Sequence, residues 1–147
     1  MPGKSGNEPA SIAAAMGAAF EALMGFLETR KLTPAGPPRS IYETYGPHGV
    51  DFVVAVPVAG PPEKPIAGGP GSVGMLDGTK AMRFTHRGPY ARLVATYGQI
   101  NEFLKAKGLM QTEADWAKYM PMWEEYLNDP HTTPEADLIT YIYLPTE

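Results

Sequence analysis

The stretch with the clearest capacity for chemistry is "MWEEYLNDP", residues 122–130, which holds two glutamates among aromatic side chains. Its pattern predicts a strand, in which side chains alternate between two faces. Glu124 and Tyr126 then share one face, and Trp123 and Glu125 share the other; a register slip of one residue would exchange them. A carboxylate among aromatic rings suits a cationic or polarised ligand, and a partly desolvated one can act as general acid or base. Taken alone, the ordinary interpretation is a solvated strand glutamate.

Aromatic side chains that could form the walls of a ligand cleft are dense in the later part of the chain. Tyrosine and tryptophan combine a large apolar face with a polar group, as ligand clefts require. Trp123 is the weakest candidate because strand alternation puts it opposite Glu124, and Tyr97 is expected in the core because it lies on an apolar helical stripe. The candidate walls are Tyr42, Tyr90, Trp116, Trp123, Tyr126 and Tyr141.

The stretch "RFTHRGPYARL", residues 83–93, predicts a corner between a strand and a helix. A phosphate-binding loop would need several glycines, and Pro89 removes a backbone donor where such a loop would use one. A catalytic His86 would need an orienting partner that the sequence does not reveal. Gly88 allows the turn, and Pro89 suits the first turn of a helix.

The sequence predicts neither a metal site nor a cofactor. The three histidines (His48, His86 and His131) are far apart, and the chain contains no cysteine, which excludes disulfides, thiolate catalysis and cysteine-ligated zinc. No Ser-His-Asp arrangement or Gly-x-Ser-x-Gly motif is present.

The elements that must position these residues follow from hydrophobic periodicity and from Pro/Gly punctuation. In the first half we expect a helix over residues 11–32 capped by Ser11, followed by two strands over 40–58 joined at Gly-Pro-His-Gly. A Pro/Gly linker leads to a strand–turn–strand over 72–88, with its turn at Asp77-Gly78, and then to a helix over 89–109 ending at Gly108. A polar loop or short helical turn over 111–121 precedes two strands over 122–145, which are separated by a turn-rich loop.

The two halves of the chain resemble each other. An offset of 109 − 32 = 77 places Phe20 on Tyr97, Leu23 on Ile100 and Leu27 on Leu104. We therefore predict one α+β domain over 1–147 built from two β-α-β-β repeats, 10–60 and 72–147, with 61–71 as linker. The antiparallel concave sheet would carry two helices on one face. The first strand of repeat one should be short or absent, and a missing edge strand would favour a homodimer.

Composition narrows the classes of partner. The 147 residues are 44% hydrophobic and 19% charged with a net charge of −4, which fits a folded domain and disfavours nucleic acid as a partner. No apolar run was expected to approach the roughly 20 residues of a membrane span. The absence of cysteine is typical of a cytoplasmic protein.

The segments "HRGPYARL", "YGQINEFLKAKGL", "WEEYLNDP" and "TPEADLITYIYLP" occur in this order between about Gly74 and the end. Together they resemble the GyrI-like (gyrase-inhibitor-like) small-molecule-binding family, which includes the effector-binding domains of AraC- and MerR-type transcription activators. The first half resembles the first repeat of that family. The resemblance implies two β-α-β-β repeats with a ligand cleft between them, and a stand-alone member because no helix-turn-helix is seen.

By the same resemblance, Glu124 matches the family's glutamate two residues before the tyrosine of "YLNDP" and would point into the cleft. The chain departs from the family at Tyr141, where an acidic residue is common, so its pocket should be less acidic and more aromatic. The expected function is binding of a small, flat, apolar or cationic aromatic molecule. One alternative is hydrolysis of a cyclopropane-bearing DNA-alkylating natural product, with Glu124 activating water and Tyr126 donating a hydrogen bond. The other is a gyrase-inhibitor-type interaction with a protein.

Overall fold

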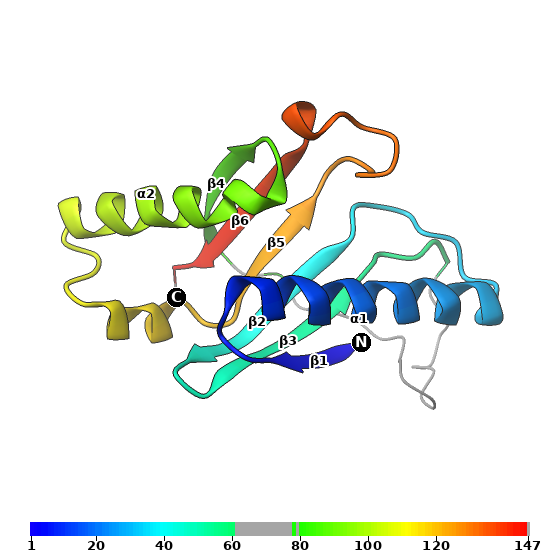
Figure 1. Ribbon diagram of the computed structural model, residues 1–147, viewed down its shortest axis with the longest axis horizontal. Helices are drawn as coiled ribbons and strands as arrows, with labels where there is room; N and C mark the ends of the chain where they lie inside the picture. Colours follow the sequence, from blue (N-terminus) through cyan, green and yellow to red (C-terminus); the bar gives the residue numbers. More distant parts are fainter. Residues whose placement is uncertain (61–77, 79, 147) are drawn as a thin grey trace.

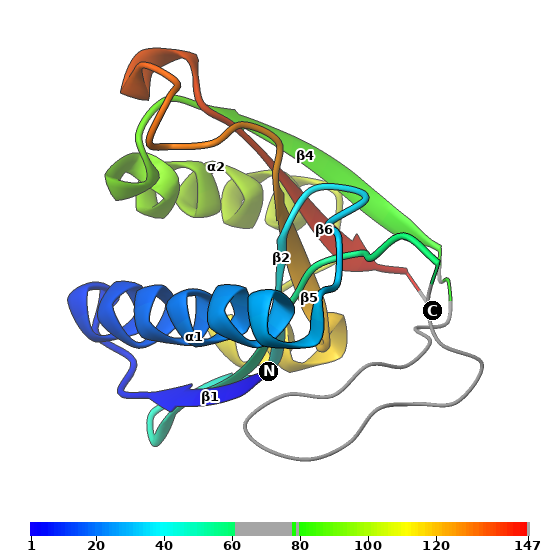
Figure 2. The same cartoon turned by 90° about the vertical axis from the view of Figure 1, so that its right-hand side faces the viewer.

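The computed structural model describes residues 1–60, 78 and 80–146. The chain has an α+β fold, in which two helices lie on the same face of one open, six-stranded antiparallel sheet (Figures 1 and 2). The main elements are β1 (Pro2–Ser5), α1 (Pro9–Arg30), β2 (Arg39–Gly46), β3 (Gly49–Ala55), β4 (Ala81–Arg87), α2 (Leu93–Ala106), β5 (Met122–Tyr126) and β6 (Ile139–Pro145). Three short helical segments, η1 (Tyr90–Arg92), η2 (Glu113–Tyr119) and η3 (Glu135–Asp137), complete the described fold.

The order of the strands places β5 at the centre of the molecule. The sheet runs β1-β3-β2-β5-β6-β4, so that β2 and β5 meet in the middle and β1 and β4 lie at the two edges. The order strand–helix–strand–strand therefore occurs twice along the chain, as the predicted α+β class required. The linker at 61–71 and the first strand of the hairpin turning at Asp77-Gly78 lie outside the described residues, and the limits of the two repeats stay a prediction.

The first strand of repeat one is present, so the expectation of a short strand is confirmed. It is short, with four residues, and it pairs with β3 from Pro2↔Val53 to Ser5↔Val50. Backbone hydrogen bonds rather than apolar side chains hold it. Gly3 is required there because a Cβ atom would lie 2.4 Å from the ring of Phe52. Since β1 covers the edge of β3, the reason for expecting a homodimer no longer applies, and the homodimer itself stays a prediction.

The first helix begins two residues before the predicted start. Glu8 occupies the N-cap position and Pro9 is the first helical residue, where its fixed φ and missing N–H are best tolerated. The predicted cap, Ser11, is inside the helix, so that prediction was wrong. The predicted apolar stripe is confirmed, because its central members are buried against the sheet. These buried residues are Met16, Leu23, Phe26 and Leu27.

The hydropathy of α1 also corrects the membrane prediction. The helix has 22 residues and contains an 18-residue window of mean hydropathy 1.6, so by length and composition it could cross a membrane. Part of that window is buried in this fold, and helices that pack in the core of a protein share this composition. Exposed alanines such as Ala13, Ala14 and Ala18 add to the hydropathy of the buried apolar stripe.

The corner after β4 has the predicted geometry. Gly88 has φ = 112°, a conformation that favours glycine, and Pro89 directly precedes η1 and α2. The second helix ends as predicted before Gly108, which has φ = 70°. His86 is buried within this corner, with Nε2 3.1 Å from the carbonyl oxygen of Pro89 and Nδ1 2.6 Å from the hydroxyl of Thr96. Both ring nitrogens therefore have structural partners.

The core lies between the sheet and the two helices. Alternation along the strands directs buried side chains such as Phe52, Val54 and Ile142 towards the helices, where they meet Leu104 of α2. The periodicity of the second helix predicts Phe103 on the same apolar face as Ile100 and Leu104, but Phe103 is 42% exposed. Its ring contacts the edge of Phe84 at a centroid distance of 5.7 Å instead of entering the core.

Candidate functional site

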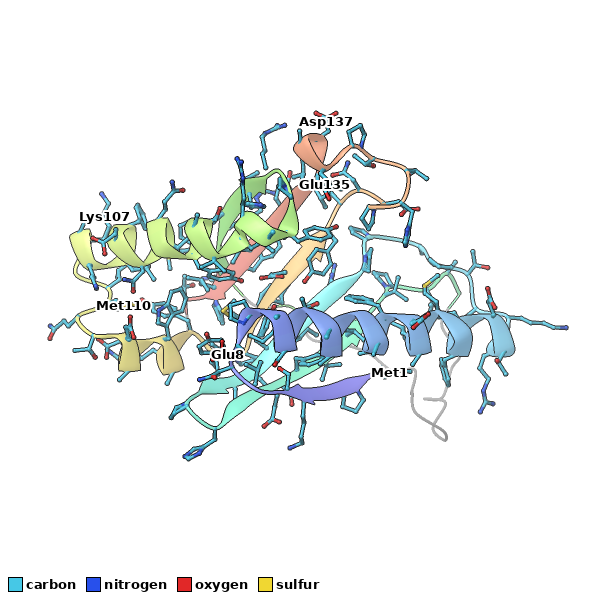
Figure 3. The ribbon with its side chains drawn as sticks, in the orientation of Figure 1. Met1, Glu8, Lys107, Met110, Glu135 and Asp137 are labelled. Carbon is cyan, nitrogen blue, oxygen red and sulfur yellow. The ribbon has the colours of Figure 1, made fainter. Side chains whose placement is uncertain are left out.

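The site is centred on Glu124, in the middle strand β5, on the face that carries the helices. Glu124 is only 2% exposed, although a glutamate is almost never fully buried unless it is paired. The alternation predicted for this stretch is confirmed, because Glu124 is buried while its neighbours in β5 are partly exposed. Figure 3 shows side chains filling the space between α1 and α2 above this strand.

Two phenols donate hydrogen bonds to the carboxylate of Glu124. The hydroxyl of Tyr97, from α2, bonds Oε1. The hydroxyl of Tyr126, two residues along β5, bonds Oε2 at 2.5 Å. Hydrogen bonds from a phenol hydroxyl to a carboxylate are short and charge-assisted. The two rings thus hold both carboxylate oxygens in a fixed orientation.

A second layer of contacts surrounds Tyr126 on the side of α1. Its hydroxyl oxygen lies 2.9 Å from Oγ of Ser40 in β2 and 3.5 Å from Sδ of Met16 in α1. The Ser40 hydroxyl is also 2.8 Å from the same sulfur. Each hydroxyl has one proton, so that Ser40 donates to Met16 while Tyr126 donates to Glu124 and keeps the Ser40 oxygen as a second acceptor within reach. Side chains of both helices and of two central strands therefore meet at one carboxylate.

Burial sets the electrostatics of this cluster. Loss of water raises the pKa of Glu124 above its ordinary value of 4.5, and the hydrogen bonds from Tyr126 and Tyr97, with the nearby His86, oppose that rise. Burial, followed by the charge of Glu124, raises the pKa of Tyr97 and Tyr126 well above 10. The phenols therefore stay protonated as donors, and the carboxyl group retains its proton to higher pH than an exposed glutamate.

The buried carboxylate forms no ion pair in the described part of the chain, where His86 is the nearby group of positive character. The ion pairs found there involve Asp51, Glu125, Glu102 and Asp115. A buried charge is normally paired or fully hydrogen-bonded, and here hydroxyl groups alone perform that function. A cationic group placed beside Glu124 would therefore find an oriented and unpaired carboxylate.

Thr140 is a further buried polar group beside this cluster. It pairs with Tyr126 across β5 and β6 and is fully buried. Its hydroxyl oxygen has no hydrogen-bond partner among the residues described. Since buried hydroxyls are nearly always hydrogen-bonded, Thr140 adds a second polar group that can take a partner near Glu124.

Four of the six predicted aromatic walls lie on the same side as Glu124, and one of them is Tyr126 itself. The ring of Tyr90 contacts that of Tyr126 edge to face, with centroids 5.4 Å apart, and Trp116 contacts Tyr97 in the same way at 6.1 Å. Tyr42 is also on this face, but it is buried in the core, and burial raises the pKa of its phenol well above 10. The partly exposed rings of Tyr90 and Trp116 therefore form an aromatic wall beside the Glu124 cluster.

The other two predicted walls are on the opposite face of the sheet. Trp123 stacks on Tyr143 with centroids 5.1 Å apart and planes 10° from parallel. Tyr141 contacts the same tyrosine edge to face, and the guanidinium of Arg83 lies 4.4 Å from its ring centre. The structure therefore separates Trp123 and Tyr141 from Glu124, because residues of adjacent positions in a strand point to opposite faces.

Sequence reasoning missed two residues that contact the cluster and misassigned a third. Tyr97 was expected to be a core residue, yet it bonds Glu124 directly. A tyrosine in an otherwise aliphatic stripe is a usable signal, because a buried phenol needs a hydrogen-bond partner. Met16 and Ser40 carried no comparable signal, since an apolar stripe and a strand serine are ordinary. In the residues described, no three His, Asp or Glu side chains gather as a metal site would require.

Comparison with known proteins identifies one family. The profile of the GyrI-like small molecule binding domain matches residues 7–147. Among solved structures, a crystal structure of a hydrolase from Listeria innocua is similar at 13% identity and a TM-score of 0.45, with 98% of this chain and 83% of that chain covered. No curated protein gives a significant match.

Proposed function

From the premise that this chain belongs to the GyrI-like family of small-molecule-binding domains, we propose that it binds a flat aromatic cation between its two helices. Glu124 supplies the negative charge. Tyr97 and Tyr126 orient the carboxylate, and Tyr90 and Trp116 provide ring faces and edges for an aromatic ligand. Thr140 offers a hydrogen bond to a polar substituent.

The observation that carries this proposal is a buried carboxylate held by two phenols without an ion-pair partner in the described chain. Desolvating a charge is unfavourable, and a cation at the same place would offset that penalty. The attraction of a cation to the faces of nearby rings acts in the same direction. A neutral ligand would gain the contacts with the rings but not the electrostatic attraction to Glu124.

The ligand must displace a covering side chain to reach Glu124, which is 2% exposed. Met16 suits that displacement. Its sulfur lies beside the hydroxyl of Tyr126, and a methionine side chain has three rotatable bonds and adapts readily to new neighbours. We infer that Met16 moves away when the ligand enters, which leaves the hydroxyls of Tyr126 and Ser40 in place.

The test is a fluorescence titration with proflavine, a planar aromatic cation, beside the neutral planar molecule acridone. Glu124→Gln should weaken proflavine by at least about tenfold, roughly 1.4 kcal/mol, and leave acridone nearly unchanged. Glu125→Gln is the matched control, because this neighbouring glutamate lies on the other face of β5 and pairs with Arg39. If Glu124→Gln weakened the affinity for proflavine and for acridone equally, or if Glu125→Gln weakened proflavine as much as Glu124→Gln does, Glu124 would not be the charge that binds the cation.

A second candidate function is hydrolysis of a strained ring, favoured by the 2.5 Å contact between Tyr126 and Glu124. The oxygen of a water molecule would bond to a cyclopropane carbon while one of its protons passes to the Glu124 carboxylate. The ring C–C bond breaks, and its electron pair moves into a conjugated carbonyl, whose oxygen takes the proton of Tyr126. The proton then returns from Glu124 to Tyr126 along their hydrogen bond, for a net addition of one water.

The raised pKa of Glu124 supports this second candidate, since a carboxylate with a raised pKa is a stronger base. Incubation with a cyclopropane-bearing alkylating compound, followed by mass spectrometry, should give a product heavier by one water. Glu124→Gln should abolish that product while the compound still binds. Recovery of unchanged compound from the native protein would eliminate hydrolysis, and full turnover by Glu124→Gln would eliminate this residue as the base.

A further inference from the structure

A groove follows the outer edge of the sheet at β4, which β6 separates from β5 and Glu124. Its volume is about 290 Å³, and it lies between the end of β4 and the first turns of α2. Figure 1 shows α2 running beside β4 at this edge. The lining residues are Thr85, His86 and Arg87 of β4, Arg92 at the end of η1, and Ala95, Thr96 and Gln99 of α2. The last four recur at three- and four-residue steps and so share one helical face.

Among the strands that the structure describes, none lies on the outer side of β4 along this groove. In the described part of the chain, β4 pairs with β6 alone. The N–H of Gly88 donates to Leu138 at 2.9 Å, and the N–H of Thr146 donates to Lys80 at 3.0 Å. In an antiparallel pair of strands, every second residue exchanges backbone hydrogen bonds with its partner. Because Lys80 and Gly88 do so, the even-numbered residues of β4 form the backbone hydrogen bonds to β6. The odd-numbered residues, Ala81, Arg83, Thr85 and Arg87, direct N–H and C=O outwards.

The charge of the groove is positive. Two arginines line it, Arg87 and Arg92, and none of its lining residues is acidic. Neither arginine forms an ion pair within the residues that are described. The net charge of the chain is −4, so this concentration of positive charge contrasts with the rest of the molecule. Guanidinium groups bind carboxylates through paired hydrogen bonds.

We propose that this edge binds an extended acidic peptide, which adds a strand to β4 and places a carboxylate between Arg87 and Arg92. Main-chain hydrogen bonds to Thr85 and its odd-numbered neighbours give the affinity, and the groove between β4 and α2 receives one side chain. Binding of this kind joins a free sheet edge to a side-chain pocket. The peptide site does not use Glu124, although His86, which lines the groove, also acts on the charge of Glu124.

Charge decides between a foreign peptide and a second copy of the chain. If two β4 edges paired antiparallel about Thr85, Arg83 of one copy would face Arg87 of the other. Like charges directly opposite each other across strands are destabilising, and charged residues on an edge discourage pairing of identical chains. An acidic strand meets no such repulsion, so the occupant is a partner of opposite charge.

The test uses the full chain and displayed libraries of eight-residue peptides with a fixed central glutamate, glutamine or lysine. The glutamate library should be enriched about tenfold over the glutamine library, which corresponds to one favourable charge contact. The double variant Arg87→Gln, Arg92→Gln should remove that preference. Lys105→Gln, an exposed lysine of α2 that does not line the groove, is the matched control and should keep it.

A second variant separates strand addition from simple attraction of an anion. Thr85→Pro removes an outward N–H, a change that an edge strand tolerates when that group faces away from the sheet. It should abolish peptide binding while both arginines remain, and thermal unfolding checks that the fold is kept. Selection of no peptide by the native chain, equal enrichment of the three libraries, or binding that survives Thr85→Pro would each overturn the proposal.

Discussion

The hydrogen bond from Tyr97 to Glu124 makes a quantitative prediction about stability. Tyr97→Phe removes one hydroxyl and keeps the ring, so its contact with Trp116 is retained. Hydrogen bonds to charged groups contribute about 1.5–3 kcal/mol. We therefore expect the free energy of unfolding to fall by about 2 kcal/mol above neutral pH, and Tm to fall by roughly 4–8 °C for a chain of this size.

The same variant should show a distinctive dependence on pH. Burial raises the pKa of Glu124 above its unfolded value near 4.5, so its contribution to stability is fully present below pH 4.5 and is lost as pH rises through the folded pKa. The Tyr97 hydrogen bond opposes that rise. Removing it raises the folded pKa further, so the stability lost with rising pH is larger in the variant. Near pH 4 only a neutral hydrogen bond is lost, about 1 kcal/mol.

Urea unfolding of the native chain and of Tyr97→Phe at pH 4 and pH 8 measures both quantities. Tyr119→Phe is the matched control, because its hydroxyl donates to the neutral carbonyl of Leu109 at 2.8 Å. That variant should lose about 1 kcal/mol at either pH. If the loss for Tyr97→Phe equals the loss for Tyr119→Phe at both pH values, the reasoning about an ionised Glu124 is wrong.

Three more predictions concern single side chains, each measured by urea unfolding. Gly49→Ala should lower the free energy of unfolding by more than about 2 kcal/mol, because φ is 123° and the new Cβ would lie 2.3 Å from a carbonyl oxygen of β1. Gly17→Ala, which has open space in α1, should raise it by roughly 0.5–1 kcal/mol. A Gly49→Ala protein more stable than Gly17→Ala would contradict the fold. Leu104→Ala should lose about 2–5 kcal/mol from a fully buried site, whereas Leu109→Ala, 44% exposed, should lose far less; similar losses would show that the core is misplaced. Glu124→Gln should flatten the fall of stability that begins near pH 4.5, and an unchanged pH profile would show that another group titrates there.

Most of the fold was predictable because its signals are local and periodic. The spacing of Met16, Leu23 and Leu27 indicated that the first helix has one buried face, and Gly108 indicated where the second helix ends. The first strand was underestimated because its residues carry no apolar pattern. Its stability comes from pairing with β3 and from the close approach of Gly3 to Phe52, which no local signal reveals.

The site was predictable only in part. Strand alternation was enough to put Glu124 and Tyr126 on one face and Trp123 on the other. The same rule could not place Tyr141, because the face that β6 turns towards the helices depends on its register with β5. The bond from Tyr97 depends on how α2 packs over the sheet, and the approach of Met16 depends on α1. Contacts between distant segments decide these positions.

The central claim is that a cation binds at the carboxylate of Glu124, and proton release upon binding tests it most directly. A bound cation must lower the raised pKa of Glu124, so binding at about pH 5, just above the ordinary value of 4.5, should expel protons. Calorimetric titration of proflavine in two buffers of different ionisation enthalpy measures that release. We predict release of a fraction of a proton by the native chain and none by Glu124→Gln. Equal release by both proteins, or binding without release, would contradict the claim.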